Sequence, residues 1–236
     1  MKLPFVKMLA LGGVSLFTLS VTQAQITWVS NGTFTSDSVL TLAGTTANEV
    51  YGVDFGGSGT QTTANGYTFA DYGNGNMSIA GGGYGLYNNY LGGGGATSDT
   101  GFNNILNYGL YGSSANTGTL NNLTVGQTYY VLAILADTRG APTAGAEFYA
   151  TDGISDSPDQ QEAFTGGSPA LGGYSLGTFV ATATAQAYSL VTQTTQGNFG
   201  NSQYNAILLE TVPEPTTLAL MGGGALTLLM ALRRKK

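Results

Sequence analysis

The chain has 236 residues, of which 8% are charged; it contains 37 glycines, no cysteine and no histidine. The lack of cysteine excludes disulfides and thiolate chemistry, and the lack of histidine removes the commonest general base and transition-metal ligand. Six of the seven Lys and Arg residues lie in the two tails, so residues 25–211 carry only Arg139 against twelve acids, a net charge of −11. Such an acidic region cannot neutralise a row of phosphates, which excludes nucleic acid as a partner.

Residues 1–24 have the pattern of a secretory signal peptide. Lys2 and Lys7 form a basic start, Met8–Val21 is an apolar core, and Thr22-Gln23-Ala24 offers small residues for cleavage before Gln25. We therefore expect export through a secretion translocon and a mature chain that begins near Gln25. An uncleaved N-terminal anchor is the alternative.

Residues 25–211 predict one all-β domain, an antiparallel sandwich of about eight to ten strands. Tyr129–Ala136 is a nearly continuous apolar run without a charge, which indicates a central strand buried on both faces. Short alternating segments between Gly- and Asn-rich turns predict the other strands. These are Ile26–Phe34, Ser38–Leu42, Val50–Phe55, Tyr67–Phe69, Met77–Ile79, Gly145–Thr151, Tyr174–Ala181, Ala187–Thr192 and Asn205–Thr211.

One short helix is expected around Phe102–Tyr111. Asp99 can cap it, and Phe102, Ile105, Leu106 and Leu110 fall at helical spacing, which places one apolar stripe against the sheet. The preceding Gly81–Thr100 is the most glycine-dense stretch of the chain, and its composition predicts a long loop.

The C-terminal tail, residues 212–236, combines three features in a fixed order. Pro213-Glu214-Pro215 is followed by the uncharged Thr216–Leu232 and then by Arg233–Lys236. As a helix at ~1.5 Å per residue, the apolar stretch reaches roughly 25 Å, the short end of what crosses a bilayer. The terminal cations should stay cytoplasmic, which predicts a single transmembrane helix with residues 25–211 on the other side of the membrane. An ordinary anchor behind a proline-rich linker is the alternative.

This tail resembles the PEP-CTERM sorting signal of Gram-negative bacteria. The resemblance rests on Pro213, Glu214 and Pro215, on the apolar run, and on the basic end that includes Arg233 and Arg234. It implies that an exosortase, a membrane-embedded cysteine transpeptidase, processes the chain at or near the motif. The protein would be anchored transiently in the inner membrane and then reach the cell surface or extracellular matrix.

A second resemblance covers about half of the region between the tails. The run Leu123–Tyr129, Gly177-Thr178-Phe179 and the strand Asn205–Leu209 are similar to jelly-roll ectodomains that often precede PEP-CTERM tails. Such domains are themselves similar to galactose-binding-like and carbohydrate-binding sandwiches. These are turn and core residues, so the resemblance implies a fold and not a ligand.

Two groups of residues are candidates for a ligand site. Tyr84, Tyr87 and Tyr90 stand three apart beside two asparagines, and aromatic faces with amide groups are what sugar sites use; the alternative is that these tyrosines form the loop's own small core. The acids Asp152, Asp156, Asp159 and Glu162 could supply oxygen ligands to Ca²⁺, or could simply be an exposed, solvated loop. No other cofactor or metal is expected.

These observations predict a non-catalytic surface or matrix protein associated with extracellular polysaccharide. One alternative is a carbohydrate-binding module that uses the three tyrosines. The other is a glycan hydrolase, which needs two carboxylates about 5–10 Å apart across a cleft, drawn from Asp137 and the four acids just named.

Overall fold

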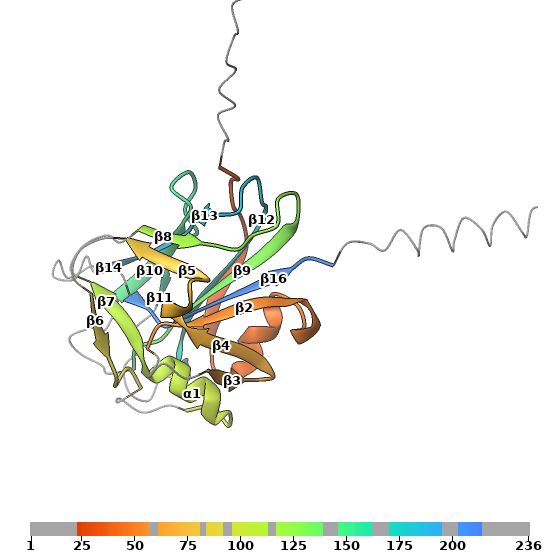
Figure 1. Ribbon diagram of the computed structural model, residues 1–236. Coiled ribbons are helices and arrows are strands. Elements are labelled where there is room, and N and C mark those ends of the chain that lie inside the picture. The colour runs from red at the N-terminus through yellow and green to blue at the C-terminus, as the bar shows by residue number, and fades with distance from the viewer. Residues whose placement is uncertain are drawn as a thin grey trace, which may run out of the picture.

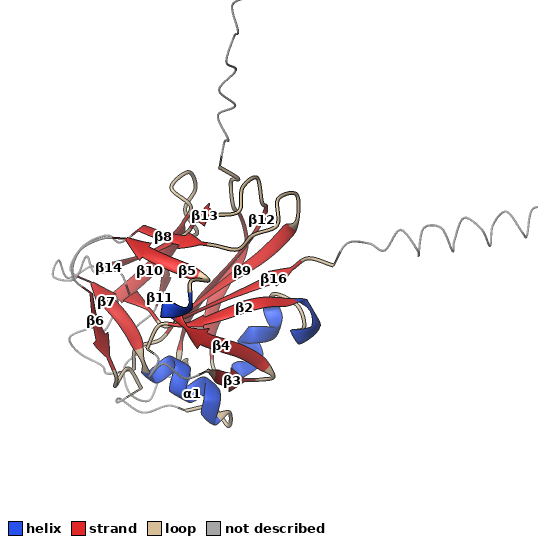
Figure 2. Cartoon of the chain, viewed as in Figure 1, coloured by secondary structure: helices blue, strands red, loops and turns tan. Residues whose placement is uncertain are grey.

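The computed structural model describes residues 23–56, 61–80, 84–91, 96–112, 117–138, 146–161, 170–194 and 203–213. Strands dominate these residues, which confirms the all-β prediction (Figures 1 and 2). Within the described residues, no helix has the length and apolar character needed to cross a membrane. The apolar core of the predicted signal peptide and the predicted span Thr216–Leu232 lie outside the described residues.

A seven-stranded sheet forms the centre of the domain, with the strand order β1-β12-β9-β16-β2-β4-β3. Its strands are β1 (Thr27–Phe34), β12 (Gly172–Val180), β9 (Thr128–Leu135), β16 (Ala206–Thr211), β2 (Glu49–Asp54), β4 (Tyr67–Asp71) and β3 (Thr62–Ala64). Neighbours are antiparallel except β2 and β4, so the prediction of a purely antiparallel sandwich is wrong at this edge. The chain returns from β2 to the sheet edge as β3 and then reverses at Asn65 and Gly66, whose positive φ angles suit a tight hairpin. β4 therefore runs alongside β2 in the same direction.

Three smaller sheets make the second layer of the sandwich, in the orders β11-β10-β14, β13-β8-β5 and β15-β7-β6. The strands are β11 (Gln160–Gln161), β10 (Ala146–Thr151), β14 (Ser189–Thr194), β13 (Gln186–Ala187), β8 (Thr117–Leu120), β5 (Met77–Ala80), β15 (Gln203–Tyr204), β7 (Gly109–Gly112) and β6 (Tyr84–Tyr87). Strand β6 lies inside the stretch predicted to be a loop, which corrects that prediction. It is ordered by pairing with β7.

Helical segments cover the other face of the central sheet (Figure 2). The predicted helix is present as α1 (Thr100–Asn107), where the Asp99 carboxylate accepts a hydrogen bond from Phe102 N at 2.8 Å and caps the first turn. The predicted strand Ser38–Leu42 is instead the 3₁₀ helix η1 (Asp37–Leu42). Two further 3₁₀ turns are η2 (Thr46–Asn48) and η3 (Tyr72–Asn74); Tyr72 of η3 packs on the side of the second layer instead.

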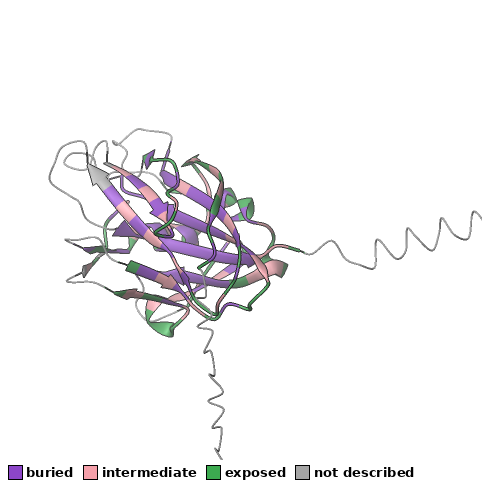
Figure 3. Ribbon diagram, turned by 90° about the horizontal axis from the view of Figure 1, so that it is seen from above, coloured by how far each residue is buried: buried purple, intermediate pink, exposed green. Residues whose placement is uncertain are grey.

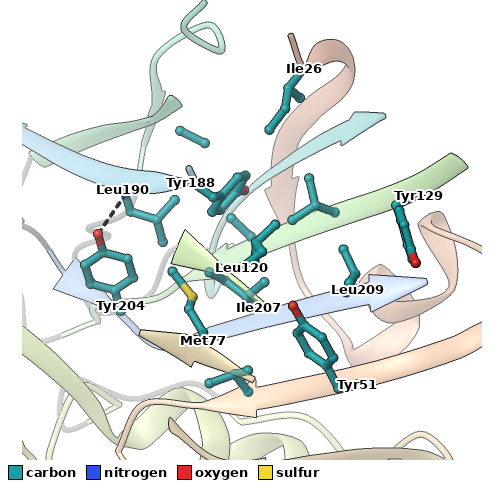
Figure 4. Packing of buried hydrophobic residues seen from close by; sticks show 14 of the residues in the cluster. Ile26, Tyr51, Met77, Leu120, Tyr129, Tyr188, Leu190, Tyr204, Ile207 and Leu209 are labelled. Carbon is teal, nitrogen blue, oxygen red and sulfur yellow. Dashed lines mark hydrogen bonds between the residues drawn. The ribbon is translucent and has the colours of Figure 1, made fainter. Parts of the chain in front are cut away.

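Strand β9 is buried on both faces, as its charge-free sequence predicted. Val131 and Leu135 join the apolar cluster between the central sheet and the second layer, whereas Leu132 and Ile134 join the cluster under α1 and η1. The central strands are accordingly buried along most of their length (Figure 3). The first cluster is rich in aromatic residues, and Figure 4 shows Leu190 N donating to the Tyr204 hydroxyl within it, at 3.1 Å.

The two tails leave the domain from the same end of the central sheet. The strand register places Thr27, Thr178, Tyr130, Glu210 and Glu49 in one row across five neighbouring strands. The start of β1 and the end of β16 are therefore three strand spacings apart, roughly 14 Å. We call this the tail end of the sheet, and the opposite end, where β9 stops at Leu135, the far end.

Candidate functional site

The sorting motif begins almost directly after the last residues of a central strand. Glu210 of β16 is fully buried, and Val212 N still donates to Thr128 O of β9 at 2.9 Å. Pro213 has no N–H to extend this ladder and is exposed, so the chain leaves the sheet there. Thr211 and Val212 alone separate the buried Glu210 from the motif. Glu214, Pro215, Arg233 and Arg234 lie outside the described residues.

The N-terminal segment is also fastened at the tail end. The Asp152 carboxylate accepts a hydrogen bond from Ile26 N at 2.6 Å, and Gln23 Nε2 donates to the Asp152 carbonyl oxygen at 2.8 Å. Gln186 Nε2 donates to Ala24 O at 2.9 Å. The position predicted for signal-peptide cleavage therefore lies against the folded domain, beside the exit of the sorting tail.

The predicted acidic cluster is divided by the fold. Asp152 is 2% exposed, and its carboxylate also accepts hydrogen bonds from the backbone amides of Ile154 and Ser155, both at 2.7 Å. Asp156 and Asp159 are exposed, and Glu162 lies outside the described residues. No group of three or more acids, histidines or cysteines within the described part of the chain is arranged to hold a metal ion. Asp152 has a structural role here, and Ca²⁺ binding stays a prediction.

Asp137 cannot form a hydrolytic pair with Asp152. Asp137 is buried beyond the last residue of β9, at the far end, whereas Asp152 lies beside Ile26 at the tail end. Strand β9 has eight residues, which at ~3.3 Å each span about 26 Å. This separation is far greater than the roughly 5–10 Å between the two carboxylates of a glycosidase.

The three candidate tyrosines differ in their surroundings. Tyr84 and Tyr87 begin and end β6, where they pair with Gly112 and Gly109. Tyr90 is 1% exposed, and its carbonyl oxygen accepts a hydrogen bond from Thr138 N at 2.7 Å, which fastens it to the far end. The buried Tyr90 ring offers no face to a ligand at the surface. The sugar-site prediction therefore depends on Tyr84 and Tyr87.

Sequence reasoning missed a buried carboxylate at the tail end. The Tyr67 hydroxyl and the Thr45 backbone N–H lie nearest to the Glu210 carboxylate, but neither makes a hydrogen bond of good geometry to it, and the Tyr67 hydroxyl donates to Gly44 O at 3.2 Å. Burial, reinforced by the charge of Glu49, raises the pKa of Glu210 to about 7. The sequence signal for this buried carboxylate was Glu210 itself, the one acid of the predicted strand Asn205–Thr211.

Glu49 lines a polar surface depression of about 350 Å³, together with Thr46, Gln61, Thr68 and Asn76. Thr68 N donates to Glu49 Oε1 at 2.9 Å, and burial raises the pKa of Glu49 as well. Glu210 is not among the residues that line this depression. A ligand in this depression would contact Glu49 but not Glu210. The two carboxylates therefore do not face each other across a cleft as a catalytic acid and base would.

We expect the domain to lose stability as pH rises through the titration of Glu210. Its pKa is about 7 in the folded protein against about 4.5 when exposed. The contribution of Glu210 to stability is therefore fully present below pH 4.5 and is lost as pH rises to about 7. Burial and the neighbouring Asp71 raise the pKa of Asp54 to about 6, which acts in the same direction. Urea unfolding of residues 23–213 at pH 5 and pH 8 should differ by on the order of 1–3 kcal/mol.

The Glu210→Gln variant should lose the larger part of this difference and be more stable than the unaltered domain at pH 8. The control is Glu147→Gln, the same change at a half-buried acid on β10. An unaltered pH profile in the Glu210→Gln variant would show that Glu210 does not titrate in this range.

Comparison with protein-family models matches residues 211–235 to the PEP-CTERM protein-sorting motif. Among curated proteins, none matches the chain. The match covers the tail and leaves the galactose-binding-like character of the sandwich without support from a relative. The chain thus ends in a PEP-CTERM sorting signal, which implies an exported protein with a membrane-anchoring tail that an exosortase processes.

Proposed function

We propose that this protein is a non-catalytic component of the cell surface or extracellular matrix that associates with extracellular polysaccharide. The observation that carries the proposal is the sorting motif that directly follows the central strand β16. A tail that leaves the domain at one end directs the opposite end away from the membrane. That far end carries the segment from β6 to Tyr90.

Sorting is tested by reversing the charge at the end of the chain. With Arg233–Lys236 replaced by acids, the terminus should no longer stay cytoplasmic, and retention and processing should fail. The intact mass of the exported protein measures this, because a processed chain ends at or near Pro213-Glu214-Pro215. Arg139→Glu is the control, since it changes the one cation between the tails and should be processed normally. If the protein with its natural tail is exported and still ends in Lys236, the sorting proposal is overturned.

Polysaccharide association is tested with the purified protein in a glycan array and a polysaccharide pull-down, with and without Ca²⁺. The informative variant is the double change Tyr84→Ala and Tyr87→Ala. Tyr90 is left in place, because removing its buried ring would destabilise the fold. Tyr111→Ala, on the neighbouring strand β7 and 44% exposed, is the matched control. Binding that is lost in the double variant alone supports a carbohydrate-binding module, and no binding at all leaves a structural role.

The hydrolase alternative is separated by a reducing-sugar assay on the same preparations. Turnover that disappears on Asp156→Asn, Asp159→Asn or Glu162→Gln substitution would establish an enzyme, whereas the buried Asp137 cannot be replaced without affecting the fold. Asp152 is unsuitable for this test, because its carboxylate holds the N-terminal segment and its loss would affect the fold.

A further inference from the structure

Exposed aliphatic side chains gather at the tail end. Val180 is the last residue of β12 and is 50% exposed, and Val125 is 59% exposed in the adjoining loop. The two positions lie side by side, since Gly126 N donates to Ala181 O at 2.8 Å and Ala181 N to Gln127 O at 2.9 Å. Ile154 is 58% exposed and belongs to the turn whose Ser155 hydroxyl donates to Ile26 O at 2.9 Å.

Further exposed valines occur near the starts of β1 and β2, at Val29 and Val50. The other large apolar residues that are exposed in the described part of the chain are Leu42, Leu86, Tyr108 and Tyr111. Isolated exposed apolar residues are ordinary on protein surfaces, but their concentration around one pair of chain exits is not.

The loops at this end carry almost no charge, although the domain as a whole is strongly acidic. The segments 121–127, 181–185 and 43–48 contain no ionisable side chain. At the edge of the sheet, the half-buried Asp99 and Asp37 lie against the β3–β4 hairpin, where the Asp99 carboxylate accepts a hydrogen bond from Asn65 N and the Asp37 carbonyl oxygen accepts one from Asn65 Nδ2. Asp152 and Glu210 are buried, Glu49 is half-buried, and Asp156 is the exposed acid of the neighbouring turn. A surface of this composition can approach anionic phospholipid headgroups, which would repel the acidic remainder of the domain.

The length of the connecting chain brings this end close to the bilayer. The uncharged stretch of the sorting tail starts at Thr216, and Val212–Pro215 can span at most about 14 Å. The N-terminal segment leaves the same end about 14 Å away. An uncleaved signal sequence would therefore tether this end of the domain to the membrane at a second point.

We propose that the tail end is a membrane-resting surface: while the sorting tail is inserted, Val125, Val180 and Ile154 contact the headgroup region of the bilayer. The inference rests on the proposed sorting function and adds an orientation and a lipid contact to it. A short connection alone would leave the domain free to swing, whereas aliphatic contacts around the exit hold it upright with the far end outward. The occupant of this surface is the phospholipid bilayer itself.

The test uses the full chain in vesicles of phosphatidylethanolamine and phosphatidylglycerol. Since the chain has no cysteine, single substitutions Val125→Cys, Val180→Cys and Leu86→Cys each give one labelling site for an environment-sensitive fluorophore. Leu86 is the matched control, because it is 61% exposed and lies on β6, in a different sheet from the tail end. A quencher attached to the lipid headgroups should quench the labels at 125 and 180 about twofold or more above the label at 86.

Each outcome has a distinct meaning. Stronger quenching at positions 125 and 180 supports the membrane-resting surface. Equal quenching at all three positions, in protein that floats with the vesicles, overturns it and leaves the sorting function intact. Protein that does not float with the vesicles contradicts the membrane-anchored tail and this inference together. Far-UV circular dichroism of each labelled chain confirms that the sheet has formed before the comparison is made.

Discussion

Replacing Asn205 with leucine is expected to lower the free energy of unfolding by about 5 kcal/mol. The buried Asn205 amide makes all four hydrogen bonds that such a group can make. Its Nδ2 donates to Leu106 O at 3.1 Å and to Tyr108 O at 2.8 Å. Its Oδ1 accepts from Ala136 N and from Gln203 Nε2, both at 3.0 Å. A leucine of similar volume would leave Leu106 O, Tyr108 O and Ala136 N without this partner in the interior, while Gln203 Nε2 would keep its bond to Ala136 O.

The measurement is urea unfolding of residues 23–213. Asn104→Leu is the matched control, because Asn104 is an exposed residue of α1 and the same change there should move stability by no more than about 0.5 kcal/mol. Similar losses in both variants would mean that the Asn205 contacts do not join α1 to the central sheet in solution.

Replacing Asp152 with alanine should cost about 3–4 kcal/mol and release the N-terminal segment. The change removes the acceptor for the backbone amides of Ile26, Ile154 and Ser155, which lie 2.6–2.7 Å from the carboxylate oxygens. Limited proteolysis should then cut near Gln23–Ile26 earlier than in the unaltered protein, and urea unfolding gives the free-energy difference.

Asp156→Ala in the same turn is the control and should have little effect on stability, since Asp156 is exposed. The pair also separates a structural role from the predicted Ca²⁺ site. If the loop binds Ca²⁺, the unaltered domain should be stabilised by added Ca²⁺, and both variants should lose that gain. A loss confined to Asp152→Ala, without any Ca²⁺ dependence, is the result that the geometry favours.

The parts of the fold that follow from local pattern were predictable. The charge-free run Tyr129–Ala136 could only be buried on both faces, and it became the central strand β9. The cap Asp99 and the spacing of Phe102, Ile105 and Leu106 fixed α1, because both signals lie within one helical segment.

The parts that failed depend on distant partners. Val39 and Leu40 are adjacent and both buried in one cluster, which a 3₁₀ turn permits and a strand with alternating faces does not. Strand β6 is formed by pairing with β7 across the intervening residues 88–108, so its glycine-rich composition hid it. The buried state of Tyr90 and of the Glu210 carboxylate likewise follows from packing against other strands, and no local pattern reports it.

The position of the tail on a central strand has a mechanical consequence. A pull on residues beyond Pro213 acts along the axis of β16, which is hydrogen-bonded on both sides, to β9 and to β2. The bonds of an antiparallel ladder lie across the strand direction, so such a force shears them together instead of opening them one at a time. A tail attached to an edge strand could be peeled away bond by bond. Tension transmitted through this C-terminus is therefore spread over the middle of the sheet, and the domain resists it as a unit.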